Sequence, residues 1–250
     1  MTTYWYRSMP QADARPDLPG SLVLHGYPVS NYFNAARAAL IEAGVDFAIE
    51  PTRAAQDEAF LSRSAMGKIP YLVTPRGCIA ETVAILEYVE DAGGGRRLYP
   101  ADPFERARVR QVINIVQVYV EGPLRSLFPG AFMGAANSAE ALGAAKPVIE
   151  RAMRALARLV DLQPFLLGRE LTHADIFAFY TFDLGERAMR FAYDASLLDQ
   201  VDGLRAWDAM MRQRESSRAV LSDFSSAFSA YLRDKGAAWR EPNPRDPAHA

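Results

Sequence analysis

The sequence predicts an α/β domain with a mixed four-stranded sheet, followed by an all-helical domain. Strand-like and helix-like segments alternate in the order β-α-β-α-β-β-α within residues 21–95. Strand signals stop at Pro103, and beyond it apolar residues recur at helical spacing. The first pattern is typical of a sheet covered by helices, and the second is typical of a helix bundle.

The first half of the α/β domain contains two strands separated by a helix. The apolar run 22–24 predicts a buried strand, and residues 32–43 carry apolar side chains at helical spacing until Gly44 ends the helix. The alternating stretch 45–50 predicts the second strand, which should run parallel to the first. The polar stretch 53–65 predicts a weak second helix.

The second half of this domain contains a hairpin. Residues 70–74 and 78–80 predict two strands joined by a three-residue turn, so these strands should be antiparallel. A third helix is expected over residues 83–91. Helices on both faces of the sheet complete the expected domain, residues 21–95.

The helical domain is expected over residues 103–235, after a linker at 96–102. Pro103 suits the first turn of a helix. Gly122 and Pro123 should kink or end this helix. Its apolar stripe consists of Val109, Val112, Ile113, Val116 and Val120.

The clearest helix start in the chain is a capping box formed by Thr172 and Asp175. The helix that follows is apolar on most sides, so we expect it to be the buried centre of the domain. The tail, residues 236–250, is rich in proline and is expected to be loose. Further helices are predicted over residues 139–161, 201–213 and 217–234.

Residues 1–20 contain three prolines and are interpreted as an irregular arm. Its aromatic residues Tyr4, Trp5 and Tyr6 either dock on the body of the protein or stay mobile. The arm has no sustained apolar run, so a secretory signal is not expected. No stretch of about 18 uncharged apolar residues occurs, so a transmembrane helix is not expected either. The expectation is a soluble cytoplasmic protein.

Composition excludes several classes of protein. With 250 residues, half of them hydrophobic and 23% charged, the chain can bury a sizeable core. The formal net charge of −2 gives no electrostatic reason for a nucleic-acid partner or a membrane surface.

Cysteine and histidine are scarce. Cys78 is the single cysteine, so an intramolecular disulfide is impossible, and its place in the fourth predicted strand suggests a buried structural thiol. The histidines His25, His173 and His249 are far apart, and no CxxC or HExxH pattern occurs. A metal site is therefore not expected.

Ser30 lies at the junction between the first predicted strand and the first helix. Free backbone N–H groups and the helix dipole favour an anion or a thiolate at such a point. A hydroxyl there can donate a hydrogen bond to a thiolate and lower the pKa of the thiol. The alternative, which spacing alone favours, is that Ser30 or Asn31 simply caps the helix.

A proline begins the third predicted strand in the sequence GKIP, residues 67–70. If the bond between Ile69 and Pro70 is cis, the backbone of Ile69 faces outward and can pair with an extended peptide. A trans bond is the more ordinary alternative.

Glu81 and Thr82 stand at the start of the third helix. The N–H and hydroxyl of Thr82 can bind the α-carboxylate of an amino acid, while Glu81 binds its ammonium group. The alternative is a threonine cap beside an unrelated acidic residue.

Taken together, these segments resemble the glutathione S-transferase family. The resemblance is carried in order by LHGYPVSNYFNAARAALIEAGVDF, SAMGKIPYLV, CIAETVAILEYVED, LYPADPFERARVRQ and FLLGRELTHADIFAF. It covers roughly residues 22–234 and implies a thioredoxin-like N-terminal domain followed by the helical domain. The SNYFN turn suggests a bacterial subgroup with serine at the activating position.

The resemblance implies how glutathione would be held. Ile69, next to a cis Pro70, would pair with the cysteinyl backbone of glutathione. Glu81 and Thr82 would hold its γ-glutamyl end, and Lys68 would reach a glutathione carboxylate.

The resemblance also implies that Ser30 activates the glutathione thiol. Asn31 stands where a proline often follows the serine, so Asn31 or Tyr32 could share or take over this role. No cysteine occupies the activating position, which argues against thioltransferase and dehydroascorbate-reductase activity.

The resemblance implies a glutathione transferase, which uses glutathione as co-substrate for attack on a small hydrophobic electrophile. It also implies a homodimer. The alternatives are a non-catalytic protein-interaction module and a glutathione-dependent isomerase or peroxidase. The electrophile should bind between the domains, near the turn at residues 27–29. Candidate lining residues, for which core packing is an equal alternative, are Tyr119, Phe128, Phe132 and Met133.

Overall fold

The computed structural model describes residues 4–6, 22–92 and 95–240. Its α/β domain is built on one mixed sheet in the order β1-β3-β2-β4-β5. As predicted, β2 runs parallel to β3, and β4 forms a hairpin with β5. The structure also pairs β2 antiparallel with β4. The strands are β1 (Tyr4–Tyr6), β2 (Leu22–Gly26), β3 (Phe47–Pro51), β4 (Tyr71–Thr74) and β5 (Gly77–Ala80).

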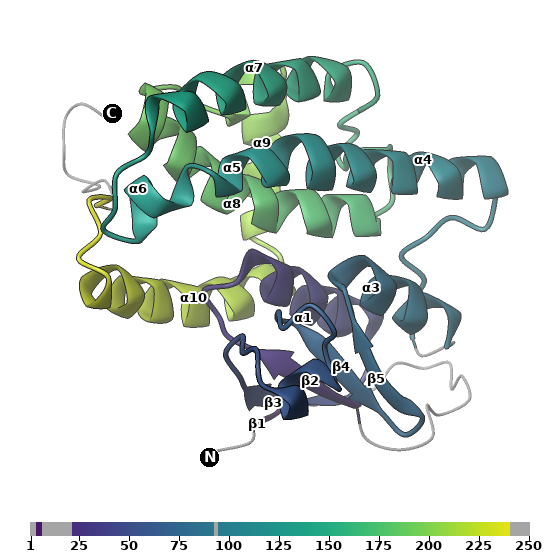
Figure 1. Cartoon of the computed structure of the whole chain (residues 1–250). Coiled ribbons are helices and arrows are strands. Elements are labelled where there is room, and N and C mark those ends of the chain that lie inside the picture. Colours follow the sequence, from purple (N-terminus) through teal and green to yellow (C-terminus); the bar gives the residue numbers. More distant parts are fainter. Residues whose placement is uncertain (1–3, 7–21, 93–94, 241–250) are drawn as a thin grey trace.

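One face of the sheet is covered by two long helices, α1 (Asn31–Ala43) and α3 (Thr82–Asp91), which separate it from the helical domain (Figure 1). Leu24 and Leu72 are register partners that point to this face, and both are fully buried. Alternation along a strand sends their neighbours to the opposite face.

The opposite face is covered less than predicted. The expected helix over residues 53–65 is only the single turn α2 (Glu58–Leu61). Its Phe60 packs edge-on against Tyr71, which in turn stacks on His25 at a ring separation of 4.3 Å. Because residues 53–65 are mostly polar, they provide one apolar anchor and no continuous helical face.

Two predictions about the edges of the sheet were wrong. The arm was expected to be irregular, but Tyr4–Tyr6 pairs antiparallel with β3 and adds a fifth strand, which agrees with the alternative that these residues dock on the body of the protein; the rest of residues 1–20 lies outside the described residues. Cys78 was expected to be buried, but it is exposed. Its strand, β5, is an edge strand that pairs with β4 alone, so its side chains lack neighbours on one flank.

The regular elements of the second domain are all helical within the described residues, apart from an isolated bridge between Phe165 and Gly168. The long α8 runs through its centre and is buried along most of its length, as predicted. The segments are α4 (Pro103–Ile115), η1 (Val116–Glu121), α5 (Gly122–Arg125), α6 (Phe128–Phe132), α7 (Ala139–Leu156), α8 (His173–Tyr193), η2 (Leu198–Gln200), α9 (Leu204–Arg212) and α10 (Glu215–Asp234).

The capping box at the start of α8 is confirmed. The backbone N–H and the hydroxyl of Thr172 both donate to Oδ2 of Asp175 over 2.9 Å. The fully buried carboxylate also accepts from the backbone of Leu166 and the indole of Trp207. Asp175 therefore fixes both the helix start and two elements packed around it.

The first helix of the domain does not end at Gly122. Instead η1 is a π-helical segment, in which the Gly122 N–H donates to the carbonyl of Gln117, five residues earlier. Pro123 has no N–H, and its ring would clash with a carbonyl in an ordinary α-helical turn. The wider turn accommodates the proline and lets the helical path continue into α5.

The linker is held by hydrogen bonds, and the described part of the predicted tail, residues 236–240, is packed rather than loose. In the linker, the N–H of Leu98 donates to Glu90 over 2.9 Å, and its carbonyl accepts from the N–H of His173. In the tail, Ala237 and Trp239 are buried, and the Trp239 N–H donates to the carbonyl of Ala131. Burial of the large Trp239 side chain offsets the conformational freedom that the chain loses; residues 241–250 lie outside the described residues.

Helix α1 joins the two domains, because it packs on the sheet and also against α8 and α10. Two ion pairs tie it to the region of α10. Arg37 pairs with Asp223 over 2.7 Å, and Glu42 accepts two hydrogen bonds of 2.7 Å from Arg214. Within the described residues, no helix is both long and apolar enough to cross a membrane.

Candidate functional site

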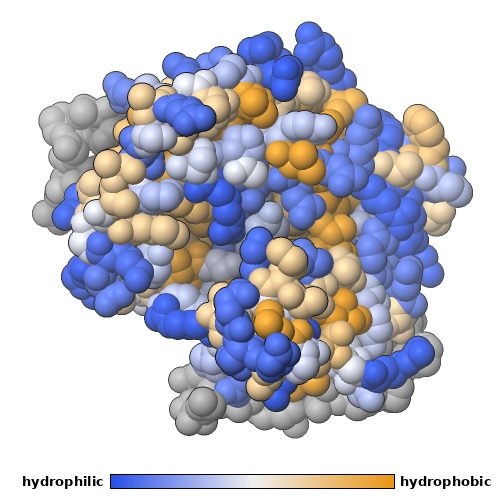
Figure 2. All heavy atoms as spheres, in the orientation of Figure 1, coloured by the Kyte–Doolittle hydropathy of each residue, from blue (hydrophilic) through white to orange (hydrophobic). Residues whose placement is uncertain are grey.

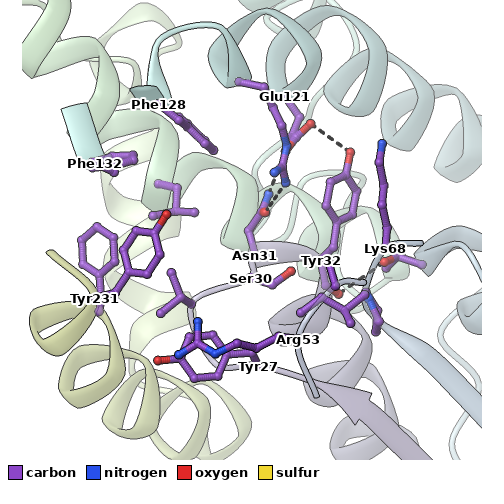
Figure 3. Close-up of a pocket in the computed structure, with 18 of the residues that line it drawn as sticks. Tyr27, Ser30, Asn31, Tyr32, Arg53, Lys68, Glu121, Phe128, Phe132 and Tyr231 are labelled. Carbon is purple, nitrogen blue, oxygen red and sulfur yellow. Dashed lines mark hydrogen bonds and ion pairs between the residues drawn. The ribbon is translucent and has the colours of Figure 1, made fainter. Parts of the chain in front are cut away.

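A cavity of about 710 Å³ lies between the two domains, beside the N-terminus of α1. Figure 2 shows the molecule hollowed on this face, and Figure 3 shows the side chains that surround the hollow. The structure brings every predicted site residue to this cavity. These residues are Ser30, Asn31, Lys68, Ile69, Pro70, Glu81 and Thr82.

Ser30 is the N-cap of α1. Its backbone is extended, and its Oγ accepts a hydrogen bond from the N–H of Phe33 over 3.3 Å. The cap uses an oxygen lone pair, so the hydroxyl hydrogen is still available to donate into the cavity. The capping role and the thiol-activating role of Ser30 are therefore compatible.

Asn31 is buried and belongs to a cluster that spans the two domains (Figure 3). Its Oδ1 accepts from Nη2 of Arg125 over 3.0 Å, and its Nδ2 donates to Oε1 of Glu121 over 3.4 Å. The same Glu121 oxygen accepts from Nε of Arg125 over 2.6 Å. The three side chains thus form a closed ring of hydrogen bonds.

Tyr32 completes this cluster. Its hydroxyl donates to Oε2 of Glu121 over 2.9 Å, and the guanidinium of Arg125 lies 5.2 Å from the centre of its ring. Burial, together with the neighbouring carboxylate, raises the pKa of Tyr32 far above its usual range. The phenol is held in its neutral form as a donor to Glu121.

Glu121 and Arg125 were missed in the sequence analysis. Glu121 is buried in the π-helical segment, and Arg125 lies one turn further along. The available signal was the proline at position 123, because wide helical turns often mark functional sites. The sequence places these side chains about 90 residues from Asn31, and only the docking of the two domains brings them together.

The bond between Ile69 and Pro70 is cis, as predicted. The loop before it is held by Ser64, whose buried hydroxyl donates to the carbonyl of Lys68 over 2.8 Å. Ile69 and Lys68 both line the cavity, and Lys68 is exposed. The loop therefore brings the residue before the cis proline and a cation to the same space.

Glu81 and Thr82 lie at the N-terminus of α3. Glu81 has φ = 66°, which is unusual for a residue other than glycine. Such a conformation costs free energy and is typical of functional sites. The Thr82 hydroxyl donates to the carbonyl of Tyr32 over 3.4 Å, while the Thr82 N–H is one of the free donors at the helix start.

The other half of the cavity is aromatic. The rings of Phe128 and Phe132 lie 5.1 Å apart, and Phe132 meets Phe228 edge-on at 5.3 Å. Tyr231 of α10 faces the same space (Figure 3). Met133 also lines the cavity, as predicted, but Tyr119 is absent from its lining and is half exposed on η1.

A cationic group stands at the edge of the cavity. The guanidinium carbon of Arg53 lies 4.1 Å from the centre of the Tyr27 ring, and both residues line the cavity. Among the residues that the structure describes, no group of three or more metal-ligating side chains occurs.

Comparison with known proteins agrees with this geometry. The family model for the glutathione S-transferase N-terminal domain matches residues 24–97. A glutathione S-transferase of Pseudomonas putida is 29% identical over 211 residues, which cover 84% of this chain and 96% of that protein. The solved structure of poplar glutathione transferase F1 has a TM-score of 0.68 at 20% identity, and the match covers 83% of this chain and 100% of that one.

Two further relatives have other names. The probable elongation factor 1-gamma 2 of Arabidopsis thaliana is 31% identical over 171 residues, which cover 66% of this chain but only 41% of that protein. Maleylacetoacetate isomerase of Mus musculus is 28% identical over 165 residues, which cover 63% of this chain and 74% of that protein.

A mixed sheet with a cis-proline loop, joined to a helical domain across a shared cavity, defines a thioredoxin-like protein with an added all-helical domain. Residues 24–97 match the N-terminal domain of the glutathione S-transferase family, and most of the chain is similar to a protein of that family.

Proposed function

We propose that the chain is a glutathione transferase that activates the glutathione thiol for attack on a small hydrophobic electrophile. The observation that carries this proposal is the shared cavity. It holds the peptide-binding loop at Ile69, the start of α3 at Thr82 and the start of α1 at Ser30, opposite an aromatic wall.

The polar half of the cavity suits glutathione. The exposed carboxylate of Glu81 and the free N–H of Thr82 can hold the charged γ-glutamyl end. The backbone of Ile69 can pair with the cysteinyl residue, and the cation of Lys68 can bind a carboxylate. With glutathione in this position, its sulfur would lie near the N-terminus of α1.

Activation requires loss of the thiol proton. A free thiol has a pKa of about 8.5, and lowering it by two units takes roughly 2.7 kcal/mol of differential stabilisation. A hydrogen bond from the Ser30 hydroxyl and the dipole of α1 together supply a term of this size. The thiol proton passes to solvent, and the thiolate forms a bond to the electrophilic carbon. In a substitution the leaving group departs with the electron pair of the broken bond, and in an addition the displaced π pair takes up a proton from solvent.

The aromatic half of the cavity supports a planar, apolar second substrate. Phe128, Phe132 and Phe228 form a continuous wall, so an aromatic ring can be buried against them. Phe132→Ala should raise KM for an aromatic electrophile while leaving glutathione affinity unchanged. An equal loss for aromatic and small aliphatic electrophiles would contradict this assignment.

A second candidate function, a non-catalytic interaction module, is favoured by the similarity to elongation factor 1-gamma. Retention on immobilised glutathione, followed by a panel of model electrophiles, separates the two functions. Binding together with turnover supports the transferase, whereas the absence of both binding and turnover supports the module.

The remaining alternatives are a glutathione-dependent isomerase and a glutathione-dependent peroxidase. Isomerisation of a cis-enone, or reduction of a peroxide, in place of conjugation would support one of these two activities.

We also propose that the protein is a cytoplasmic homodimer. In the family that the chain resembles, the N-terminal domain of one subunit pairs with the helical domain of the other. Exposed apolar side chains occur in both domains, Met66 before the cis-proline loop and Phe104 at the start of α4. Burying such side chains in a two-fold interface would stabilise the dimer.

A further inference from the structure

We propose that Glu121 and Arg125 of the helical domain are positioning residues that orient the Asn31 carboxamide, so that it offers an N–H rather than its carbonyl oxygen to the glutathione thiolate. This inference rests on the proposed function. It assigns to the helical domain a role in activating a thiol that the other domain holds.

The orientation of the amide follows from charge. Oδ1 of Asn31 meets the guanidinium of Arg125 at 3.0 Å, and Nδ2 meets the carboxylate of Glu121 at 3.4 Å. A flipped amide would place its oxygen against the carboxylate and its NH₂ group against the guanidinium. Both contacts would then be repulsive, so the ion pair selects a single orientation.

One amide hydrogen is left for a ligand. The Asn31 NH₂ group has two hydrogens, and only the bond to Glu121 occupies it among the described residues. Asn31 is the first residue of α1 and lines the cavity beside Ser30. Its second N–H can therefore join the Ser30 hydroxyl and the backbone N–H groups as a donor to the sulfur.

The ring of contacts also fixes the side chain in space. Glu121 is buried and is held by Arg125 at 2.6 Å and by the Tyr32 hydroxyl at 2.9 Å. Arginine can bind both partners at once because its guanidinium is planar and presents several donors in a fixed geometry. The amide is thus set by residues that do not themselves need to touch glutathione.

The test is a double-mutant cycle. The quantity measured is the pKa of the thiol of bound glutathione, which is monitored through the ultraviolet absorbance of the thiolate. The paired variant Glu121→Gln with Arg125→Gln keeps a polar, uncharged side chain at both positions but removes the charges that select one amide orientation. It should raise the thiol pKa by about one pH unit, the size expected for a lost hydrogen bond to a charged group. In an Asn31→Ala background, the same pair should cause no further rise.

Glu42→Gln is the matched control. Glu42 also joins α1 to the helical domain through a partly buried pair with Arg214, but it does not line the cavity. It should lower the unfolding temperature without moving the thiol pKa.

If the paired variant does not fold, Arg125→Lys is the second variant. Lysine keeps the charge beside Glu121 but cannot hold both partners in a fixed plane. It should therefore give a smaller rise in the thiol pKa, and the Asn31→Ala background should abolish that rise as well.

An unchanged thiol pKa in the folded variants would overturn the inference, as would an equal rise in the Asn31→Ala background. In either case a wild-type protein that still lowers the thiol pKa would leave the proposed transferase function intact. A wild-type protein that neither binds glutathione nor lowers its thiol pKa would instead contradict the proposed function itself.

Discussion

The hydroxyl of Tyr32 donates to the carboxylate of Glu121 over 2.9 Å, which joins the first helix of the α/β domain to the π-helical segment of the other. This contact defines the role that Tyr32 can have. A phenol that donates to a buried carboxylate, with its pKa raised by burial, is not available as a donor to a thiolate. The contact therefore favours Ser30 and Asn31 over Tyr32 as activating residues.

Replacing Ser30 by alanine should slow conjugation far more than it weakens glutathione binding. In the proposed site the hydroxyl would stabilise the ionised thiol, whereas Ile69 and the start of α3 would hold the peptide. The pKa of the bound thiol should rise, so the rate should recover partly at alkaline pH. The measurement is the pH dependence of the conjugation rate, beside calorimetry of glutathione binding.

The matched control is Ser138→Ala. Ser138 caps α7 through the same contact, with its Oγ accepting from the N–H of Ala141 over 3.1 Å. Loss of either cap should lower stability by about 1 kcal/mol, but only Ser30→Ala should change the rate. If Asn31→Ala shifts the pH profile and Ser30→Ala does not, the activating role belongs to Asn31.

Replacing Glu81 by alanine should weaken glutathione binding by about tenfold to a hundredfold, because the γ-glutamyl ammonium loses its anionic partner. Glu81→Gly tests the backbone separately, since glycine adopts φ = 66° without strain. Both variants should show the same weakening by calorimetry. Unchanged glutathione affinity in both variants would show that Glu81 does not contribute to glutathione binding.

Stability should fall as the pH drops below about 6.5, in part because of His173. This ring is fully buried 3.6 Å from Glu90, and burial lowers the pKa of His173 below its ordinary value of 6.5. The unfolded chain then binds a proton that the folded chain resists. Stability is complete above the unfolded pKa and is lost as the pH falls from there toward the folded pKa.

Urea unfolding of wild type and His173→Phe between pH 8 and about 5 measures this effect. One such group contributes at most about 1.4 kcal/mol per pH unit. The variant, which keeps an aromatic ring beside Tyr99, should lose less stability on acidification. Parallel stability curves for the two proteins would show that His173 is not responsible.

Cys78 should react with a thiol reagent in the native protein, because its side chain is exposed on the edge strand β5. It does not line the cavity, so Cys78→Ser should keep full affinity for glutathione. The measurement is the rate of labelling with and without denaturant. Labelling that requires denaturant would show the thiol to be protected.

The protein should have twice the 27.7 kDa mass of one chain in light scattering. Charged substitutions of both Met66 and Phe104 should shift the mass toward that of the monomer, because a charge cannot be buried in an apolar interface without cost. A wild-type mass near 27.7 kDa would contradict the dimer.

Much of the fold could be predicted because its signals are local. The helix that ends at Gly44 and the hairpin of β4 and β5 each follow from residues within one helical turn or one strand pair. The capping box of Thr172 and Asp175 depends on residues three positions apart. Such patterns act on the backbone regardless of what packs against them later.

The tertiary contacts of each element could not be predicted from such local patterns. The sequence by itself determined that a helix follows Ser30, that a strand follows Pro70 and that Glu81 precedes another helix. Only the tertiary structure decided that Cys78 is exposed, that the tail is held by Trp239, and that Glu121 reaches Asn31. The physical reason is that burial and side-chain partners depend on how whole elements dock, and no pattern within a single element records which distant surface it will meet.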